Sequence, residues 1–242
     1  MAGTAPATTS EDLALHVLGR FAIFANEQPI AIPNNAERLL GYLAVTSTEQ
    51  RRDVAAGRLW PWGSQDRAMA NLRTAIWQVR SAHRRLLEVR RDTVELGSRV
   101  CVDYADVTAE THKLAVSADR GHVEVPESLF EAELLPGWDE EWLLLERERH
   151  RQARLHALEI LSARFAGSGH FAHAIDLAYA AIRIEPLRES ANIILISTHA
   201  AEGNHTEALR QFRAYAHLLR VETGLSPSLE LKQALAGLPC PE

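Results

Sequence analysis

Residues 66–87, DRAMANLRTAIWQVRSAHRRLL, decide the fold of the N-terminal part of this chain. At 100° per residue, the apolar side chains fall on one arc and arginines gather on the opposite side, which predicts one amphipathic helix with a buried inner face. Ser64 is its predicted cap, because a serine hydroxyl can accept a hydrogen bond from an unpaired amide of the first turn. The predicted buried arc consists of Ala68, Leu72, Ala75, Ile76, Val79, Ala82 and Leu86.

The residues before this helix predict strands and then a first, shorter helix. Side chains alternate along residues 13–32 in the manner of strands, and Asn26 with Glu27 offers a turn between them. Apolar residues at helical spacing then begin at about Asn35. Either Asn34 or Asn35 is the predicted cap of this first helix.

A second helix and a hairpin complete the pattern. The second helix is predicted over residues 52–60, where Pro61 stops it. After the long helix, residues 93–96 and 99–102 predict a β-hairpin with Gly97 at its turn. Strands, three helices and a hairpin follow one another in a winged helix-turn-helix, whose later helix lies in the major groove of DNA.

From residue 105 onward the strand signal disappears, and the remainder predicts helices that repeat. The segment GHFAHAI at 169–175 aligns with GNHTEAL at 203–209, an offset of 34 residues. This period is typical of tetratricopeptide helix pairs, each of which buries its apolar face on its neighbour. Chance similarity in an alanine-rich helical chain is the alternative. The same offset pairs Ala157 with Ala191, Ile160 with Ile194 and Leu161 with Leu195.

Length and composition indicate a folded protein of two domains. The chain has 242 residues, of which 46% are hydrophobic and 24% charged. We expect a mostly α fold, a winged helix-turn-helix with small β-sheets followed by an all-α tetratricopeptide-like domain. The expected divisions are a disordered tail at 1–12, a DNA-binding domain at 13–104 and the repeat domain at 105–242.

The sequence shows neither a targeting segment nor a redox framework. The tail lacks the basic and apolar parts of a signal peptide, and no apolar run is long enough to cross a bilayer, so we expect a cytoplasmic protein without a membrane partner. Cys101 and Cys240 are far apart and have no CxxC partner. A disulfide framework or a thiolate metal site is therefore not expected.

Positive charge is concentrated in one stretch of an otherwise acidic chain. The formal net charge is −6, yet residues 51–91 hold ten arginines, no lysine and only three acids, a balance of +7. Such a segment indicates a surface that binds a polyanion. A solvated, arginine-rich helix face explains the composition equally well and stays open.

The outward side of residues 66–87 carries the side-chain types that read DNA. Arginine can bond a guanine edge through two parallel hydrogen bonds, asparagine and glutamine suit adenine, and small hydroxyls bond phosphate oxygens. Outside the helix, Arg51 and Arg52 are predicted phosphate contacts, and Arg99, near the predicted hairpin tip, is a minor-groove or phosphate contact. The predicted contacts on the helix are Arg67, Asn71, Arg73, Thr74, Trp77, Gln78, Arg80, Ser81, Arg84 and Arg85.

Trp77 is the most informative of these residues. It lies opposite the predicted buried face, where an indole exposes a large apolar area unless something covers it. Three coverings stay open, namely the sugar and methyl groups of a DNA groove, a neighbouring protein surface, and the wing of the same domain.

No other motif carries a second chemistry. Gly167 and Gly169 begin a dinucleotide-like pattern, but a predicted helix precedes them where that pattern needs a strand. His170, His173 and Asp176 share one helical side without a further ligand. No glycine-rich run precedes a lysine, and no nucleophile stands beside a base. We therefore expect no enzyme, no cofactor and no metal.

Six short motifs of the chain match those of a known family. RLWP at 58–61 and ANLRTAIWQVR at 70–80 lie in the N-terminal part. The C-terminal part contains LLPGW at 134–138, EPLRES at 185–190, EGN at 202–204 and ETGLSPSLEL at 222–231. With these motifs the chain resembles the Streptomyces antibiotic regulatory protein (SARP) family over residues 13–235. Members of this family join an OmpR-type winged helix to a bacterial transcriptional activator domain.

The resemblance implies a transcriptional activator that is associated with the nucleoid. It would bind direct repeats in double-stranded promoter DNA as side-by-side protomers, a homodimer on DNA, and recruit RNA polymerase holoenzyme to genes of secondary metabolism such as antibiotic biosynthesis. It also implies a short member of the family, without ATPase and sensor modules. A tetratricopeptide-like protein-interaction module with a vestigial winged helix is the alternative. The implied polymerase contacts are Trp62, Gly63, Ser64 and Gln65.

Overall fold

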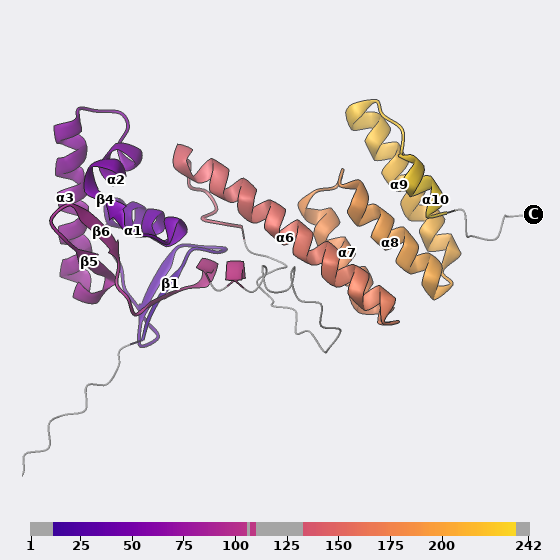
Figure 1. The fold of residues 1–242 in the computed structure, drawn as a ribbon, viewed down its shortest axis with the longest axis horizontal. Coiled ribbons are helices and arrows are strands. Elements are labelled where there is room, and N and C mark those ends of the chain that lie inside the picture. The colour runs from indigo at the N-terminus through magenta and orange to yellow at the C-terminus, as the bar shows by residue number, and fades with distance from the viewer. Residues whose placement is uncertain (1–11, 106, 110–132, 236–242) are drawn as a thin grey trace, which may run out of the picture. The chain divides into compact units, whose positions relative to one another are not determined.

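The computed structural model forms two compact units (Figure 1) and describes residues 12–105, 107–109 and 133–235. The N-terminal unit draws on residues 1–107 and 132–148, and the C-terminal unit on 108–131 and 149–242. This division differs from the predicted boundary between residues 104 and 105, because the segment from 133 to 148 packs in the N-terminal unit. All but the last residue of the predicted tail at 1–12 lies outside the described residues.

A four-stranded sheet opens the N-terminal unit. In spatial order its strands are β3 (Gln28–Pro29), β2 (Ala22–Ala25), β1 (Leu13–His16) and β7 (Val100–Val102). β1 pairs antiparallel with β2 and parallel with β7. Asn26 and Glu27 have φ angles of 47° and 65° between β2 and β3, which confirms the predicted turn.

Three helices complete the core of this unit, α1 (Asn34–Thr46), α2 (Arg52–Leu59) and α3 (Gln65–Ala82). α3 packs against both α1 and α2 with the inner face that its spacing predicts. The outer face of α3 is thereby left for contacts outside the unit. Its buried residues are Ala68, Leu72, Ala75, Ile76 and Val79.

The two predicted helix caps have opposite outcomes. The hydroxyl of Ser64 accepts a hydrogen bond from the amide of Arg67 at 3.3 Å, which confirms the cap of α3. The asparagine cap of α1 is wrong. Pro33 takes that position without a side-chain cap, and its carbonyl oxygen accepts hydrogen bonds from the amides of Ala36 and Glu37.

α3 ends at Ala82, well before residue 87, where the sequence places its end. His83 is extended, with a φ of −158°, and Arg84–Leu86 continue as a single 3₁₀ turn, η1. This turn carries the Leu86 side chain into the core, whereas Ala82, predicted to be buried, is exposed. The spacing of apolar residues does not show that the helix ends at Ala82. Leu86 continues the helical spacing and is buried, although its backbone belongs to the 3₁₀ turn.

The wing is the hairpin of β5 (Leu87–Val89) and β6 (Thr93–Leu96), which joins β4 (Gln50–Arg51) in a three-stranded sheet. The predicted hairpin of 93–96 with 99–102 is wrong, because β6 pairs with β5 and β4 while β7 crosses to β1. Arg99 therefore lies in the turn between the two sheets, and the wing tip is formed by residues 90–92.

Gly97 is required by this crossing and does not serve a hairpin turn. Its amide donates to the carbonyl oxygen of Leu86 at 2.9 Å, and a Cβ atom at position 97 would overlap the backbone oxygen of Arg85. Gly97→Ala should lower the free energy of unfolding by about 1–3 kcal/mol, since backbone cannot move aside as a side chain can. Urea denaturation measures this loss. As a control, Gly57→Ala in α2, where nothing lies within 4 Å of the new Cβ, should be neutral or raise stability by about 0.5–1 kcal/mol. An equal loss in both variants would contradict the assigned contact.

Residues 133–138 pack against the end of the N-terminal sheet. The amide of Leu135 donates to the carbonyl oxygen of Val17 at 2.7 Å, and Leu18 forms a β-bridge with Leu134. Both leucines of this LLPGW motif are buried in the core that also holds the helices of the winged helix. The motif is therefore part of the N-terminal unit.

One tryptophan and two arginines hold this segment in place. The indole of Trp138 lies so close to α1 that a Cβ on Gly41 would be 2.8 Å from it. From α1, Arg38 Nε and Nη2 donate to Glu140 Oε1 and Oε2 at 2.6 and 2.9 Å. Arg147 donates to the backbone carbonyls of both leucines in the motif. The small glycine and the paired charges are thus matched to residues far away in the sequence.

The C-terminal unit is an array of helices that confirms the predicted repeat. α7 packs on α8 and α8 on α9, which lie in succession in Figure 1. Gly169 and Gly203 stand one period apart and both adopt the left-handed conformation, with φ of 77° and 87°. Ala157 and Ala191, 34 residues apart, are both buried. The helices are α6 (Glu141–Gly167), whose residues up to Glu148 belong to the N-terminal unit, α7 (Phe171–Ile184), α8 (Glu189–Glu202), α9 (His205–Thr223) and α10 (Leu229–Gln233).

The EPLRES motif joins the helices of this unit. Arg188 donates from Nε and Nη2 to the carboxylate of Glu159 at 2.7 and 2.9 Å. Glu189 accepts hydrogen bonds from the Tyr215 hydroxyl at 3.2 Å and from the Ser228 amide at 3.3 Å. Burial, followed by the charge of Glu189, raises the pKa of Tyr215 to about 12, so this hydroxyl remains a donor at neutral pH. The motif thus stabilises the fold.

Candidate nucleic-acid interface

α3 presents a basic surface on the side opposite its buried face. Arg73 and Arg80 are exposed and lie seven residues apart, about two helical turns. Between them Trp77 is 68% exposed, so the wing does not cover it. Two of the three coverings left open by the sequence remain, a DNA groove and a neighbouring protein.

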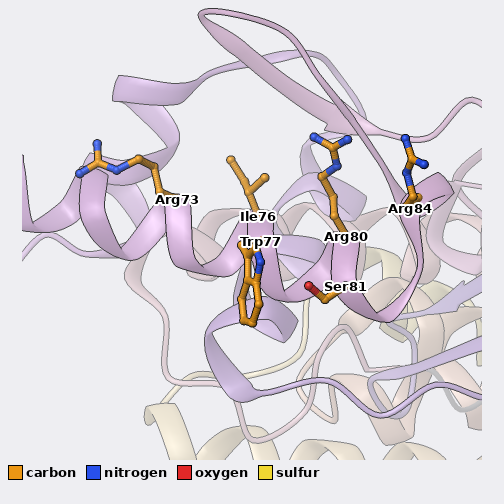
Figure 2. Close-up of a pocket in the computed structure, with 6 residues that line it drawn as sticks. All are labelled: Arg73, Ile76, Trp77, Arg80, Ser81 and Arg84. Atoms are coloured by element: carbon orange, nitrogen blue, oxygen red, sulfur yellow. The ribbon is translucent and has the colours of Figure 1, made fainter.

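Five exposed side chains of this surface, together with Ile76 of the buried face, line a depression of about 320 Å³ (Figure 2). Figure 2 shows the guanidinium groups of Arg80 and Arg84 on one side of the helix, with the indole of Trp77 pointing to the other side. A molecule seated here would meet cationic groups along one border and an aromatic ring along the other. The lining residues are Arg73, Ile76, Trp77, Arg80, Ser81 and Arg84.

The arginines of this surface differ from the other arginines of the positive stretch. Arg90 pairs with Glu49 at 2.5 Å and with Glu95 at 3.1 Å, and hydrogen bonds from Thr93 and Arg90 lower the pKa of Glu49. Both acids lie outside residues 51–91, so a charge count over that stretch overlooks them. Within the part of the chain that the structure describes, the arginines without an ion pair include Arg67, Arg73, Arg80 and Arg84.

Some of the other predicted contacts on α3 are less accessible than Arg73, Trp77 and Arg80. Arg67 and Thr74 are exposed, but the threonine hydroxyl donates to the carbonyl oxygen of Ala70 at 3.1 Å. Asn71 and Gln78 are half-buried, and Oε1 of Gln78 is buried without a hydrogen-bond partner among the described residues. Gln78 cannot offer both atoms of its amide to an adenine unless it moves.

The predicted phosphate contacts Arg51 and Arg52 are engaged within the unit. Arg51 Nη2 lies 2.7 Å from Asp53 Oδ2, and this hydrogen bond together with the charge of Asp53 raises the pKa of Arg51. Arg52 Nη1 donates to the carbonyl oxygen of Arg91 at 3.3 Å. Each arginine would exchange an existing partner for a phosphate, which reduces what it can contribute to affinity.

The break at the end of α3 changes the setting of the remaining predicted contacts. Arg84 and Arg85 are exposed on η1, where Arg84 still lines the depression and Arg85 lies outside it. Ser81 is exposed in the last turn of α3. Arg99 is exposed in the turn between β6 and β7.

A second hollow, of about 600 Å³, lies beside the loop that joins α2 to α3. Trp62 on this loop is 92% exposed, and the other implied polymerase contacts, Gly63, Ser64 and Gln65, are exposed as well. Local sequence gives no signal for this hollow, because its walls come from three separate parts of the chain. These parts are residue 38, residues within 58–71 and residues within 139–144. The lining side chains include Arg58, Trp60, Arg67, Asp139 and Glu141.

The described residues contain neither a metal-binding cluster nor a helix fit to span a membrane. Among the residues described here, no three His, Cys, Asp or Glu side chains are grouped so that they could hold a metal ion. His173 instead stacks on Phe165, with ring centroids 5.4 Å apart. None of the described helices combines the length and the apolar character that a membrane span requires.

Two comparisons relate the chain to known proteins. Residues 120–237 match the family model of the bacterial transcriptional activator domain. No curated protein matches the chain in sequence. Among solved structures, Mycobacterium tuberculosis EmbR, in complex with a low-affinity phosphopeptide, is similar at a TM-score of 0.73 and 16% sequence identity.

The likeness to EmbR covers both units. It extends over 94% of this chain and 65% of the EmbR chain, so the present sequence spans less than two thirds of that protein. At this identity the likeness establishes the shared fold, a winged helix followed by an all-helical repeat domain. The activator-domain match covers the second part of that fold and includes the LLPGW and EPLRES motifs.

Proposed function

We propose that this chain is a transcription regulator of the Streptomyces antibiotic regulatory protein type, which binds promoter DNA sequence-specifically through α3 and activates transcription. One observation carries the proposal. The outer face of α3 combines exposed arginines without ion pairs in the described chain with an exposed indole, while its inner face is packed in the core. A helix with these two faces can enter the major groove, which is about 12 Å wide, without disturbing its own domain.

Contacts beyond α3 would set orientation and activity. Side-by-side protomers on direct repeats would double the basic surface, and Arg67, Arg85 and Arg99 are exposed where phosphates would flank the groove. The exposed loop at 62–65 would contact RNA polymerase holoenzyme. The regulated genes would be those of secondary metabolism, and the protein would work in the cytoplasm on the nucleoid.

Selection of bound DNA from a random pool tests the proposal directly. The purified full-length protein should enrich one short sequence, repeated in the same orientation at a spacing near one helical turn or a multiple of it. Enrichment of the same sequence by an Arg73→Ala, Arg80→Ala double variant would contradict the role of α3. Absence of any enriched sequence would contradict DNA recognition itself and favour the interaction-module alternative.

Affinity should also fall steeply with salt. If each protomer neutralises about four phosphates, log K should decrease with log salt at a slope of about −3.6 per protomer, roughly 150-fold between 50 and 200 mM. Fluorescence anisotropy on the selected site and on random DNA measures both slopes. Arg67→Ala should weaken binding to the selected site and to random DNA by the same factor, and should make each slope less steep by about 0.9. A slope near zero would contradict a phosphate-based interface.

A further inference from the structure

The apolar part of the α3 surface has a chemical setting that favours one kind of ligand. Trp77 is 68% exposed, whereas Ile76, the only aliphatic residue among those lining the 320 Å³ depression, is 7% exposed and points to the opposite side of the helix in Figure 2. The other four lining residues are three arginines and one serine. No carboxylate lines the depression, so it suits a partner that is negatively charged overall but apolar at one point.

The major groove offers such a point at one standard base. Thymine carries a C5-methyl group there, whereas guanine, adenine and cytosine present only hydrogen-bond donors and acceptors. Arg73 and Arg80 are about 10.5 Å apart along the axis of α3 at 1.5 Å per residue, a length that matches about three base-pair steps. Trp77 stands between them and points to the other side of the helix in Figure 2.

We propose that Trp77 is a specificity-determining residue that reads the 5-methyl group of a thymine next to the base pairs contacted by Arg73 and Arg80. The inference rests on the proposed function, because it requires α3 to lie in the major groove. The indole edge covers the methyl group, and the arginines hold the flanking base edges or phosphates. The site therefore takes a 5-methylpyrimidine and discriminates against the same base without its methyl group.

Replacing single thymines by deoxyuridine tests this inference, since the substitution removes the methyl group and keeps every hydrogen-bonding atom. The duplex is the site selected by the full-length protein, and each thymine is replaced in turn. At one position in each repeat, the replacement should lower the affinity of the wild-type protein about fourfold. This is the equivalent of ~0.8 kcal/mol for one buried CH₂-sized group. The other positions should change it less than twofold.

Three variants identify the residue responsible. Trp77→Ala should bind the thymine site more weakly and lose the preference for thymine over uracil at the sensitive position. Trp77→Phe keeps an aromatic ring and should retain that preference in part. Tyr179→Ala removes an exposed aromatic residue from α7 and should keep the full fourfold preference. Melting temperatures of all three variants establish that each is folded before its binding is compared.

The outcomes separate this inference from the function on which it rests. Specific binding with no sensitive position in the wild type would overturn the methyl-reading role and leave DNA recognition standing. A thymine preference that survives in Trp77→Ala would assign the methyl contact to another residue and overturn the inference equally. A wild-type protein that binds no DNA sequence specifically would instead overturn the proposed function. The protein could instead self-associate in a way that requires Trp77, while no replacement of thymine by uracil changes DNA binding. That result would place a second copy of the protein on this surface and reject the inference.

Discussion

Replacing Arg73 and Arg80 together by alanine should lower affinity for the selected DNA by about 2–6 kcal/mol, from roughly thirtyfold to more than ten-thousandfold. A bidentate arginine–guanine contact is worth about 1–3 kcal/mol of discrimination. The two residues lie two turns apart on α3, so their losses should be nearly additive. The measurement is fluorescence anisotropy at one salt concentration, with the specific site and random DNA in parallel. Specific binding should fall much further than non-specific binding.

The chain offers a matched control for this double substitution. Arg213 and Arg220 are exposed on α9 and have the same seven-residue spacing, so Arg213→Ala with Arg220→Ala removes the same charge from the other unit. This control should change affinity less than about threefold, the scale of a screened long-range field. Equal losses in the two double variants would mean that overall charge, and not the face of α3, controls binding.

Leu135→Ala should destabilise the N-terminal unit by about 2–5 kcal/mol, the usual cost of emptying a fully buried leucine site. Leu135 is 0% exposed, and its amide is bonded to Val17 in the loop after β1. The residue belongs to the region matched by the activator-domain family, yet the loss should fall on the DNA-binding unit. Urea denaturation measures the total loss, and hydrogen exchange should place it in β1 and α1.

Leu145→Ala is the control for this prediction. It makes the same chemical change ten residues further on, at a side chain that is 67% exposed, and should cost less than about 0.5 kcal/mol. If Leu135→Ala increased exchange only in the helices α7 to α9, the LLPGW segment would stabilise the C-terminal unit and its place in the winged-helix core would be wrong.

The candidate interface was predictable where a single helix defines it. The inner face of α3 follows from 3.6 residues per turn, and so does the position of Arg73, Trp77 and Arg80 on the opposite side. The end of this helix was not predictable in the same way. Leu86 continues the apolar register and becomes buried, although His83 has already left the helical conformation. Periodicity reports which side chains face inward and does not report the backbone that takes them there.

The sequence also does not show which acidic side chains form ion pairs with the arginines. Composition counts Arg51 and Arg90 as part of a positive surface, but Asp53 neutralises one, and Glu49 with Glu95 neutralises the other. The wing pairing was missed for a related reason. Two short apolar segments around a glycine satisfy the hairpin pattern, while the close approach of a distant backbone to Gly97 cannot be seen in that pattern.

By itself the sequence determined the two-part organisation, the inner face of α3, the cap at Ser64 and the 34-residue helical repeat, because each depends on neighbours within a few turns or on self-similarity. Only the tertiary structure decided that β7 joins β1, that the wing is β5 with β6, and that Leu134, Leu135 and Trp138 complete the core of the N-terminal unit. These contacts join residues far apart in the chain. The physical reason is that burial stabilises any apolar surface that packs closely against its neighbours. Close packing is a property of the assembled unit and not of a local sequence pattern.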